Sequence, residues 1–197
     1  MACTSGKGRF NLSSKNDWEQ ICHEVQERLL ITPLEVKSAK TLWAELLKCL
    51  IAASDDGFLE TEHHKFHNLL KMKEDDENKG MIIITGGKKN QKRRKEVPHF
   101  ERFDGCWFDF AITVDEKTKP AKVIAFNFEI RFLDDNPIGF LRFDLNPPGH
   151  NNEKRGIRFH IHLSSDNVKV HSPPMSPLEI LHLFLYDLKM PERPRSS

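Results

Sequence analysis

The feature that most constrains this fold is the alternation of apolar and polar residues in four runs between residues 107 and 163. Successive side chains of a β-strand point to opposite faces, so a period of two predicts strands with one apolar face. A turn at residues 115–120 joins the first two runs as a hairpin, and the later runs extend it into an antiparallel meander. The predicted apolar face comprises Phe108, Phe110, Ile112, Val114, Ile124, Phe126, Phe128, Ile130, Phe132, Leu141, Phe143, Leu145, Ile157, Phe159, Ile161 and Leu163.

Helical patterns flank these runs on both sides. Asn16 has the properties of a cap for a first helix, and Thr32-Pro33 is a strong start for a second helix that ends near residues 56–57. A third helix is expected from Thr61 to about Met72. Near the C-terminus, Ser176-Pro177-Leu178-Glu179 opens a helix through Leu188, which we expect to cover the apolar face of the sheet.

These patterns together predict an α+β fold. We expect a helical N-terminal part at residues 1–80, a basic linker or loop at 81–105, and the antiparallel sheet with its C-terminal helix at 106–190. Short additional strands are expected at Met81–Thr85 and Val168–His171.

Composition limits the classes of protein to consider. The 197 residues include 30 Lys+Arg and 29 Asp+Glu, so attraction to nucleic acid would come from local patches rather than from net charge. No apolar run has the length of a membrane span, and the four cysteines show no metal-ligand spacing. We therefore expect a cytoplasmic protein with reduced thiols and no membrane partner.

The polar face of the predicted sheet is unusual in composition. Such faces are usually rich in Thr, Lys, Glu, Ser and Gln, whereas this one carries several arginines and two histidines. Arginine binds phosphate in a fixed fork, and histidine titrates near neutral pH. This face is therefore the predicted functional site, although a solvated sheet surface is the simpler alternative. It comprises Asp109, Asn127, Glu129, Arg131, Arg142, Asp144, Arg158, His160 and His162.

One hypothesis for this face is metal-free phosphodiester cleavage by a ribonuclease-like enzyme. Arg142 and Arg158 would hold the phosphate, with Arg131 as a further phosphate-binding residue. His160 or His162 would act as general base or acid, while His150, from the turn-rich segment 146–156, would supply the complementary proton transfer. Asp144 would fix the tautomer of an imidazole.

A metal-bound variant of the same site is also open. His160 and His162 are alternate residues of one strand, and with His150 and Asp144 they could form a three- or four-ligand site for zinc or manganese. The cofactor is thus either absent or a divalent metal. The cluster His63, His64 and His67 has no carboxylate or cysteine obviously placed to complete such a site.

The order Arg142-Phe143-Asp144-Leu145-Asn146, then His150, then His160-Ile161-His162 resembles the motif of TumE-type toxins from bacterial toxin–antitoxin modules. The resemblance implies a compact toxin that a partner antitoxin neutralises, with RNA metabolism as its target. This chain differs from the family pattern in its long N-terminal helical part and in a longer insertion before His160.

Two further interpretations stay open. Asp109 on one strand and Glu129-Ile130-Arg131 on the next resemble the core of PD-(D/E)xK nucleases, with Arg131 where that family has lysine. Alternatively, the face belongs to a module that binds nucleic acid or protein without turnover.

A dense basic segment precedes the predicted hairpin. It would attract the phosphates of RNA or DNA, or it is simply a solvated linker, since it has no interleaved aromatic residues to stack on bases. Its cations are Lys88, Lys89, Lys92, Arg93, Arg94 and Lys95.

Overall fold

The computed structural model describes residues 34–134, 136–172 and 174–188; the helix predicted from Asn16 lies outside them. The described strands form one antiparallel sheet with the order β2-β3-β5-β6-β7-β8-β9, while β1 pairs with β6 and β4 with β5. The strands are β1 (Glu35–Val36), β2 (Leu70–Glu74), β3 (Met81–Gly86), β4 (Phe100–Glu101), β5 (Trp107–Asp115), β6 (Ala121–Arg131), β7 (Phe140–Leu145), β8 (Phe159–Leu163) and β9 (Val170–His171).

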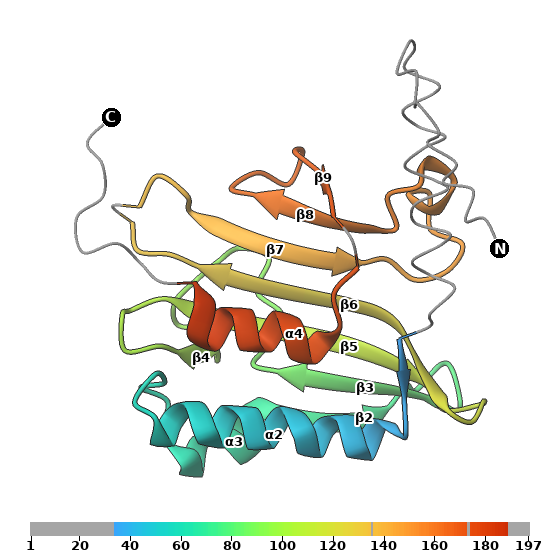
Figure 1. The fold of residues 1–197 in the computed structure, drawn as a ribbon, viewed down its shortest axis with the longest axis horizontal. Helices are drawn as coiled ribbons and strands as arrows, with labels where there is room; N and C mark the ends of the chain where they lie inside the picture. Colours follow the sequence, from blue (N-terminus) through green and yellow to red (C-terminus); the bar gives the residue numbers. More distant parts are fainter. Residues whose placement is uncertain (1–33, 135, 173, 189–197) are drawn as a thin grey trace, which may run out of the picture.

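Figure 1 shows α2 (Ala39–Asp55) and α4 (Pro177–His182) in front of one face of this sheet, and α4 continues as the π-helical turn η2 (Leu183–Asp187). The short helix α3 (His63–Leu69) leads into the edge strand β2 and lies behind α2 in this view. The predicted α+β class is confirmed, and so is the C-terminal helix against the sheet. In the part of the chain described, no helix is both long and apolar enough to cross a membrane.

The core lies between the helices and the apolar face of the sheet. Phe110 stacks on Phe128, with ring centroids 4.8 Å apart, and Phe128 meets Phe184 of η2 edge-on. Aromatic pairs in these arrangements contribute beyond their buried area. Most of the large side chains of the alternating runs therefore lie where predicted, with Phe126, Phe128, Phe143 and Phe159 in one core. The prediction is wrong for Ile124, because a register shift between β5 and β6 puts Val123 in the core instead, and for Leu163, which is exposed.

The start of α2 differs from the prediction. The helix begins at Ala39 rather than at Pro33, because the Ser38 side chain accepts a hydrogen bond from the Thr41 amide and caps it there. Glu35 and Val36 form β1, which pairs with Ala121 and Lys122 of β6, while Thr32 and Pro33 lie outside the described residues. A strand pairing with β6 therefore takes up residues that the prediction placed in the first turn of the helix.

The third helix is shorter than predicted. It ends at Leu69, and the residues expected in its last turn form β2 instead, where Met72 is paired with Ile84 of β3. Strand β3 confirms the short strand expected at Met81–Thr85. Because β3 pairs with β5 and β4 also pairs with β5, residues 81–105 contribute two strands to the main sheet.

Candidate functional site

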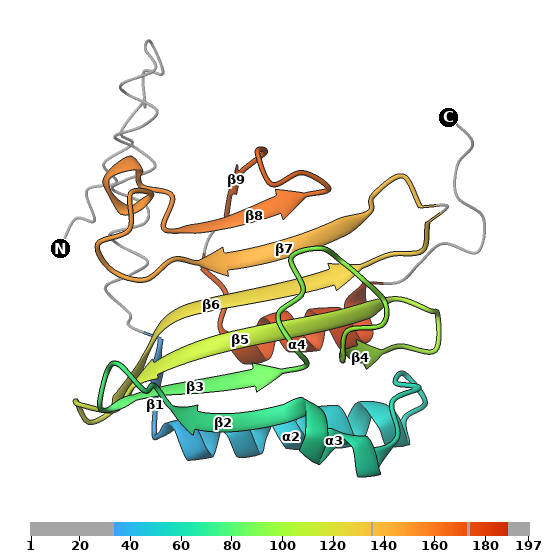
Figure 2. The same ribbon diagram turned by 180° about the vertical axis from the view of Figure 1, so that it is seen from behind.

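The loop of residues 87–99, between β3 and β4, lies over the polar face of the sheet, opposite the helices (Figure 2). Its anchor is the buried Asn90, whose side chain accepts from the Arg94 amide and donates to the Arg94 carbonyl. The Asn90 carbonyl in turn accepts from Arg131 of β6 at 3.2 Å. The segment interpreted from sequence as a mobile loop or linker is therefore packed against the predicted site.

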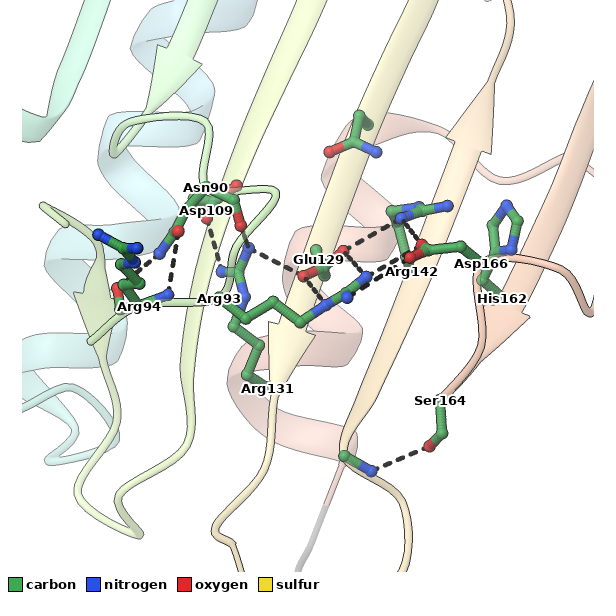
Figure 3. Close-up of polar contacts among 12 residues, drawn as sticks. Asn90, Arg93, Arg94, Asp109, Glu129, Arg131, Arg142, His162, Ser164 and Asp166 are labelled. Carbon is green, nitrogen blue, oxygen red and sulfur yellow. Dashed lines mark hydrogen bonds and ion pairs between the residues drawn. The ribbon is translucent and has the colours of Figure 1, made fainter. Parts of the chain in front are cut away.

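Four side chains form a ring of ion pairs on this face, drawn in Figure 3. Arg93 of the loop donates to Glu129 of β6 at 2.9 and 3.3 Å and to Asp166 of the β8–β9 loop at 3.0 and 3.5 Å. Arg142 of β7 donates to Asp166 at 2.5 Å and to Glu129 at 3.4 Å. We call Arg93, Glu129, Arg142 and Asp166 the charge ring.

Asp109, Glu129 and Arg131 make a second, more deeply buried group. Arg131 donates to Asp109 at 2.6 Å and pairs with Glu129 at 2.9 Å, so its guanidinium occupies the space between the two carboxylates. A nuclease of the D…ExK kind would need a metal ion in that position. Burial raises the pKa of Asp109 to about 6, against the opposing effect of Arg131.

His160, His162 and Asp144 converge beside the charge ring. The Nε2 atoms of the two histidines are 3.0 Å apart, and they lie 3.8 Å and 3.3 Å from Oδ2 of Asp144. Nδ1 of His160 is 3.0 Å from the Ile157 carbonyl, and Nδ1 of His162 is 3.2 Å from the Ser165 carbonyl. We call Asp144, His160 and His162 the triad.

The hydrogen bonds to the two backbone carbonyls determine the chemistry of the triad. A carbonyl only accepts, so each Nδ1 carries a proton, and in a neutral ring Nε2 then presents a lone pair. Both lone pairs face the same point as the Asp144 carboxylate. Burial lowers the pKa of His160 to about 4, which favours its neutral form.

Asp144 is held by residues of two strands. Its Oδ1 accepts a hydrogen bond from Asn127 of β6, and its Oδ2 accepts one from Nε of Arg142 at 3.0 Å. Burial opposes ionisation of this carboxyl, but the hydrogen bond that a doubly protonated His162 donates, the charge of Arg142 and the hydrogen bond from Asn127 outweigh it and lower its pKa. Asp144 is therefore an oriented carboxylate.

An open groove of about 600 Å³ runs along this face. The charge ring, Asp109, Arg131 and Asp144 all line it, and so does Lys89 at its exposed edge. The lining thus holds four cations and four carboxylates, and each of its three arginines is ion-paired. The two triad histidines lie behind this lining, buried to about 2% exposure or less.

Two predicted site residues lie apart from the triad. Arg158 donates to the backbone carbonyls of Asn146 and Ile124 at 2.7 and 2.6 Å, and His150 is exposed and accepts from the Asn152 amide. Of the basic segment, Arg93 joins the charge ring and Lys95 pairs with Glu101 at 2.9 Å, whereas Lys88, Lys89, Lys92 and Arg94 have exposed side chains.

Sequence reasoning missed Asp166. Nothing in the turn-like sequence around it signals a role, because its importance comes from two arginines that are distant in the chain. Within residues 34–134, 136–172 and 174–188, the triad is the group of His, Cys, Asp and Glu side chains arranged to hold a metal ion, with ligand atoms within 4.8 Å of one another.

Comparisons with protein-family models, with curated proteins and with solved structures found no match. The geometry of the triad and of the groove is therefore what indicates a function.

Proposed function

We propose that this protein is a divalent-metal-dependent phosphodiesterase that acts on RNA and holds its metal with Asp144, His160 and His162. The observation that carries the proposal is the convergence of two histidine lone pairs and one oriented carboxylate oxygen. Zinc and manganese are the metals that these ligands favour.

The distances within the triad suit a metal ion. With bonds of about 2.0–2.1 Å in a tetrahedral arrangement, ligand atoms lie roughly 3.3 Å apart. The triad distances of 3.0, 3.3 and 3.8 Å surround this value. Metal-binding histidines usually donate their other N–H to a carbonyl or carboxylate, as the Ile157 and Ser165 carbonyls allow here.

Charge favours the metal-dependent form of the hypothesis over the metal-free form. The groove lining is neutral overall and its arginines are already ion-paired, so in the absence of a metal a phosphodiester must compete with carboxylates for them. A bound dication would give the groove a net positive charge. In addition, the buried histidines lie behind the groove, where direct proton transfer to a substrate is hindered.

Some residues of the chain would orient the metal ligands, and others would attract the substrate. A divalent metal at the triad would supply Lewis acidity and a water molecule of lowered pKa. Arg142 and Asn127 orient Asp144, the triad member that lines the groove. Exposed Lys88, Lys89 and Lys92 would attract the sugar–phosphate backbone.

The test is a cleavage assay with labelled RNA and DNA. Protein stripped with EDTA should be inactive, and added Zn²⁺ or Mn²⁺ should restore cleavage of RNA. Asp144→Asn should remove activity, whereas the matched control Asp76→Asn, at an exposed site, should not. Cleavage that persists in EDTA at the wild-type rate would overturn the metal-dependent proposal.

A second candidate function is binding of RNA or DNA without turnover. The exposed lysines of residues 88–92, of which Lys89 lines the groove, favour it, because such cations bind phosphates without any catalytic group. Retention of labelled RNA without cleavage, under every metal tested, would select this function.

In the cell, the proposed enzyme would act as a toxin. A cytoplasmic enzyme that cleaves RNA would need control, and the resemblance to TumE-type toxins implies a partner antitoxin. Expression of the wild-type chain should arrest growth, while expression of Asp144→Asn should not. Equal growth of the two strains, at equal protein levels, would remove the toxin role.

A further inference from the structure

We propose that Arg93 and Arg142 form a phosphate-binding subsite and that the carboxylate of Asp166 occupies it in the resting protein. This inference deepens the proposed function by naming where a substrate phosphate binds. It does not depend on the metal, because the subsite is built from the charge ring rather than from the triad.

Both arginines point their outer N–H groups at one carboxylate. Nη2 of Arg93 and Nη1 of Arg142 lie 3.0 Å and 2.5 Å from the same Oδ1 atom of Asp166. Two guanidiniums that converge on a single anionic oxygen form the kind of clamp that recognises phosphate. Asp166 therefore takes the place that a phosphate oxygen would take.

The two guanidiniums are held independently of Asp166. The buried Glu129 accepts from both of them, and Arg93 also lies 3.6 Å from the centre of the Phe140 ring. Arg142 is fixed further by Asp144. When Asp166 leaves, the clamp keeps its shape, so binding of a phosphate does not require the arginines to be ordered first.

The backbone of Arg93 supports a role beyond folding. Its φ angle is 50°, in the left-handed region that disfavours a residue with a side chain. Glycine would be the ordinary choice at such a position. An unfavourable backbone conformation that aims a side chain into a groove is typical of a functional residue.

Asp166, in contrast, can be displaced. Its side chain is 57% exposed, and exposed ion pairs are weak and sensitive to salt. It belongs to the short loop between β8 and β9, whose Ser165 carbonyl is tied to His162. We expect the carboxylate to move by rotation of its side chain while the loop backbone stays anchored.

The groove gives a phosphate access to this subsite. Arg93, Arg142 and Asp166 all line it, together with Asp144 of the triad. A phosphate that replaces Asp166 would therefore lie beside the proposed metal ligand. It would also remove one of the four carboxylates from a groove that is otherwise balanced in charge.

The test uses inorganic phosphate and the full chain in EDTA, so that no metal contributes. Binding is measured by titration calorimetry at constant ionic strength. Asp166→Asn keeps the size of the side chain and removes its charge, and it should bind phosphate about fivefold or more tightly than wild type, because a competing charge is lost. Arg93→Gln should bind at least about fivefold more weakly than wild type.

Asp76→Asn, at a distant exposed carboxylate, is the matched control and should bind like wild type. Asp166→Ser serves as a second variant, and circular dichroism checks that each variant is folded. Equal phosphate affinity of wild type and both Asp166 variants would overturn the inference, even if metal-dependent cleavage is observed. Tighter binding by the Asp166 variants, with no cleavage under any metal, would uphold the subsite and reject the proposed enzyme.

Discussion

His160 and His162 face each other on β8 with their Nε2 atoms 3.0 Å apart. Each Nδ1 donates to a backbone carbonyl, so two neutral rings would bring two lone pairs together. A cation between them removes this repulsion, either as a shared proton or as a metal ion. The nearby carboxylate of Asp144 strengthens the preference for a cation of higher charge.

We first predict that His162→Ala abolishes high-affinity metal binding. Loss of one of three ligands should weaken Zn²⁺ binding by at least about 100-fold, since changes in the outer shell alone cost 10–100-fold. Titration with a zinc indicator measures the affinity. His64→Ala, at an exposed histidine of α3, is the control and should bind as wild type does. Unchanged Zn²⁺ affinity in His162→Ala would contradict the triad as a metal site.

Asn127 is expected to act on the metal through Asp144. Asn127→Ala removes the hydrogen bond to Oδ1 and frees the carboxylate to rotate, so Zn²⁺ affinity should fall about 10-fold. The free energy of unfolding, measured in urea without metal, should change by less than about 1.5 kcal/mol. Asn68→Ala on the exposed surface of α3 is the matched control. An equal affinity in wild type and Asn127→Ala would show that Asp144 does not need this support.

Gly86→Ala should destabilise the sheet. A Cβ atom at Gly86 would lie 2.1 Å from Cε1 of Phe110, its cross-strand neighbour. The Phe110 ring is 3% exposed and stacked on Phe128, so it has little room to move. Overpacking of this kind costs roughly 1–3 kcal/mol in the free energy of unfolding, which urea denaturation measures.

Gly139→Ala is the control for that substitution. A Cβ atom at Gly139 meets no heavy atom within 4 Å, so its addition should leave stability nearly unchanged. If the two variants unfold at the same urea concentration, the close approach of Phe110 to Gly86 is not a constraint on the fold.

The raised pKa of Asp109 should make the stability of the protein depend on pH. Its folded-state pKa is about 6, above the unfolded value of 3.8, so between these values the folded state binds the extra proton. The contribution of this group to stability is therefore full below pH 3.8 and falls as pH rises to about 6. In Asp109→Asn this loss is absent.

Between pH 4 and pH 7, the unfolding free energy of wild type should accordingly fall by on the order of 2 kcal/mol relative to that of Asp109→Asn. Urea unfolding at half-unit pH steps provides the measurement. A difference that stays constant over this range would show that Asp109 titrates at its ordinary pKa.

The pattern of apolar and polar residues was enough to assign the two faces of the sheet. Alternation alone placed Phe128 and Phe143 in the core and put Asp144, His160 and His162 on the polar face, because the period of a strand leaves no other choice. The spacing of His160 and His162 also ensured that they would be neighbours on one strand. Capping residues predicted the C-terminal helix in the same local way.

Which polar residues contact one another depends on how the strands pair in the folded protein. The β7–β8 register pairs Asp144 with His160 and Arg142 with His162, and no local pattern specifies that register to one residue. Arg158 shares the parity of His160, yet its long side chain reaches the carbonyls of Asn146 and Ile124 instead. Alternation assigns a residue to a face of the sheet, but the place where a long side chain such as that of Arg158 ends depends on its hydrogen-bond partners.

The position of the loop of residues 87–99 could not be predicted from the sequence either. Its basic composition has no periodicity, so nothing local distinguishes a solvated linker from a packed loop. Arg93 reaches Glu129 and Asp166 only because folding brings β6 and the β8–β9 loop to the same place. Periodic burial is a local property that a sequence displays directly, whereas pairing of charges between distant segments exists only once the chain has folded.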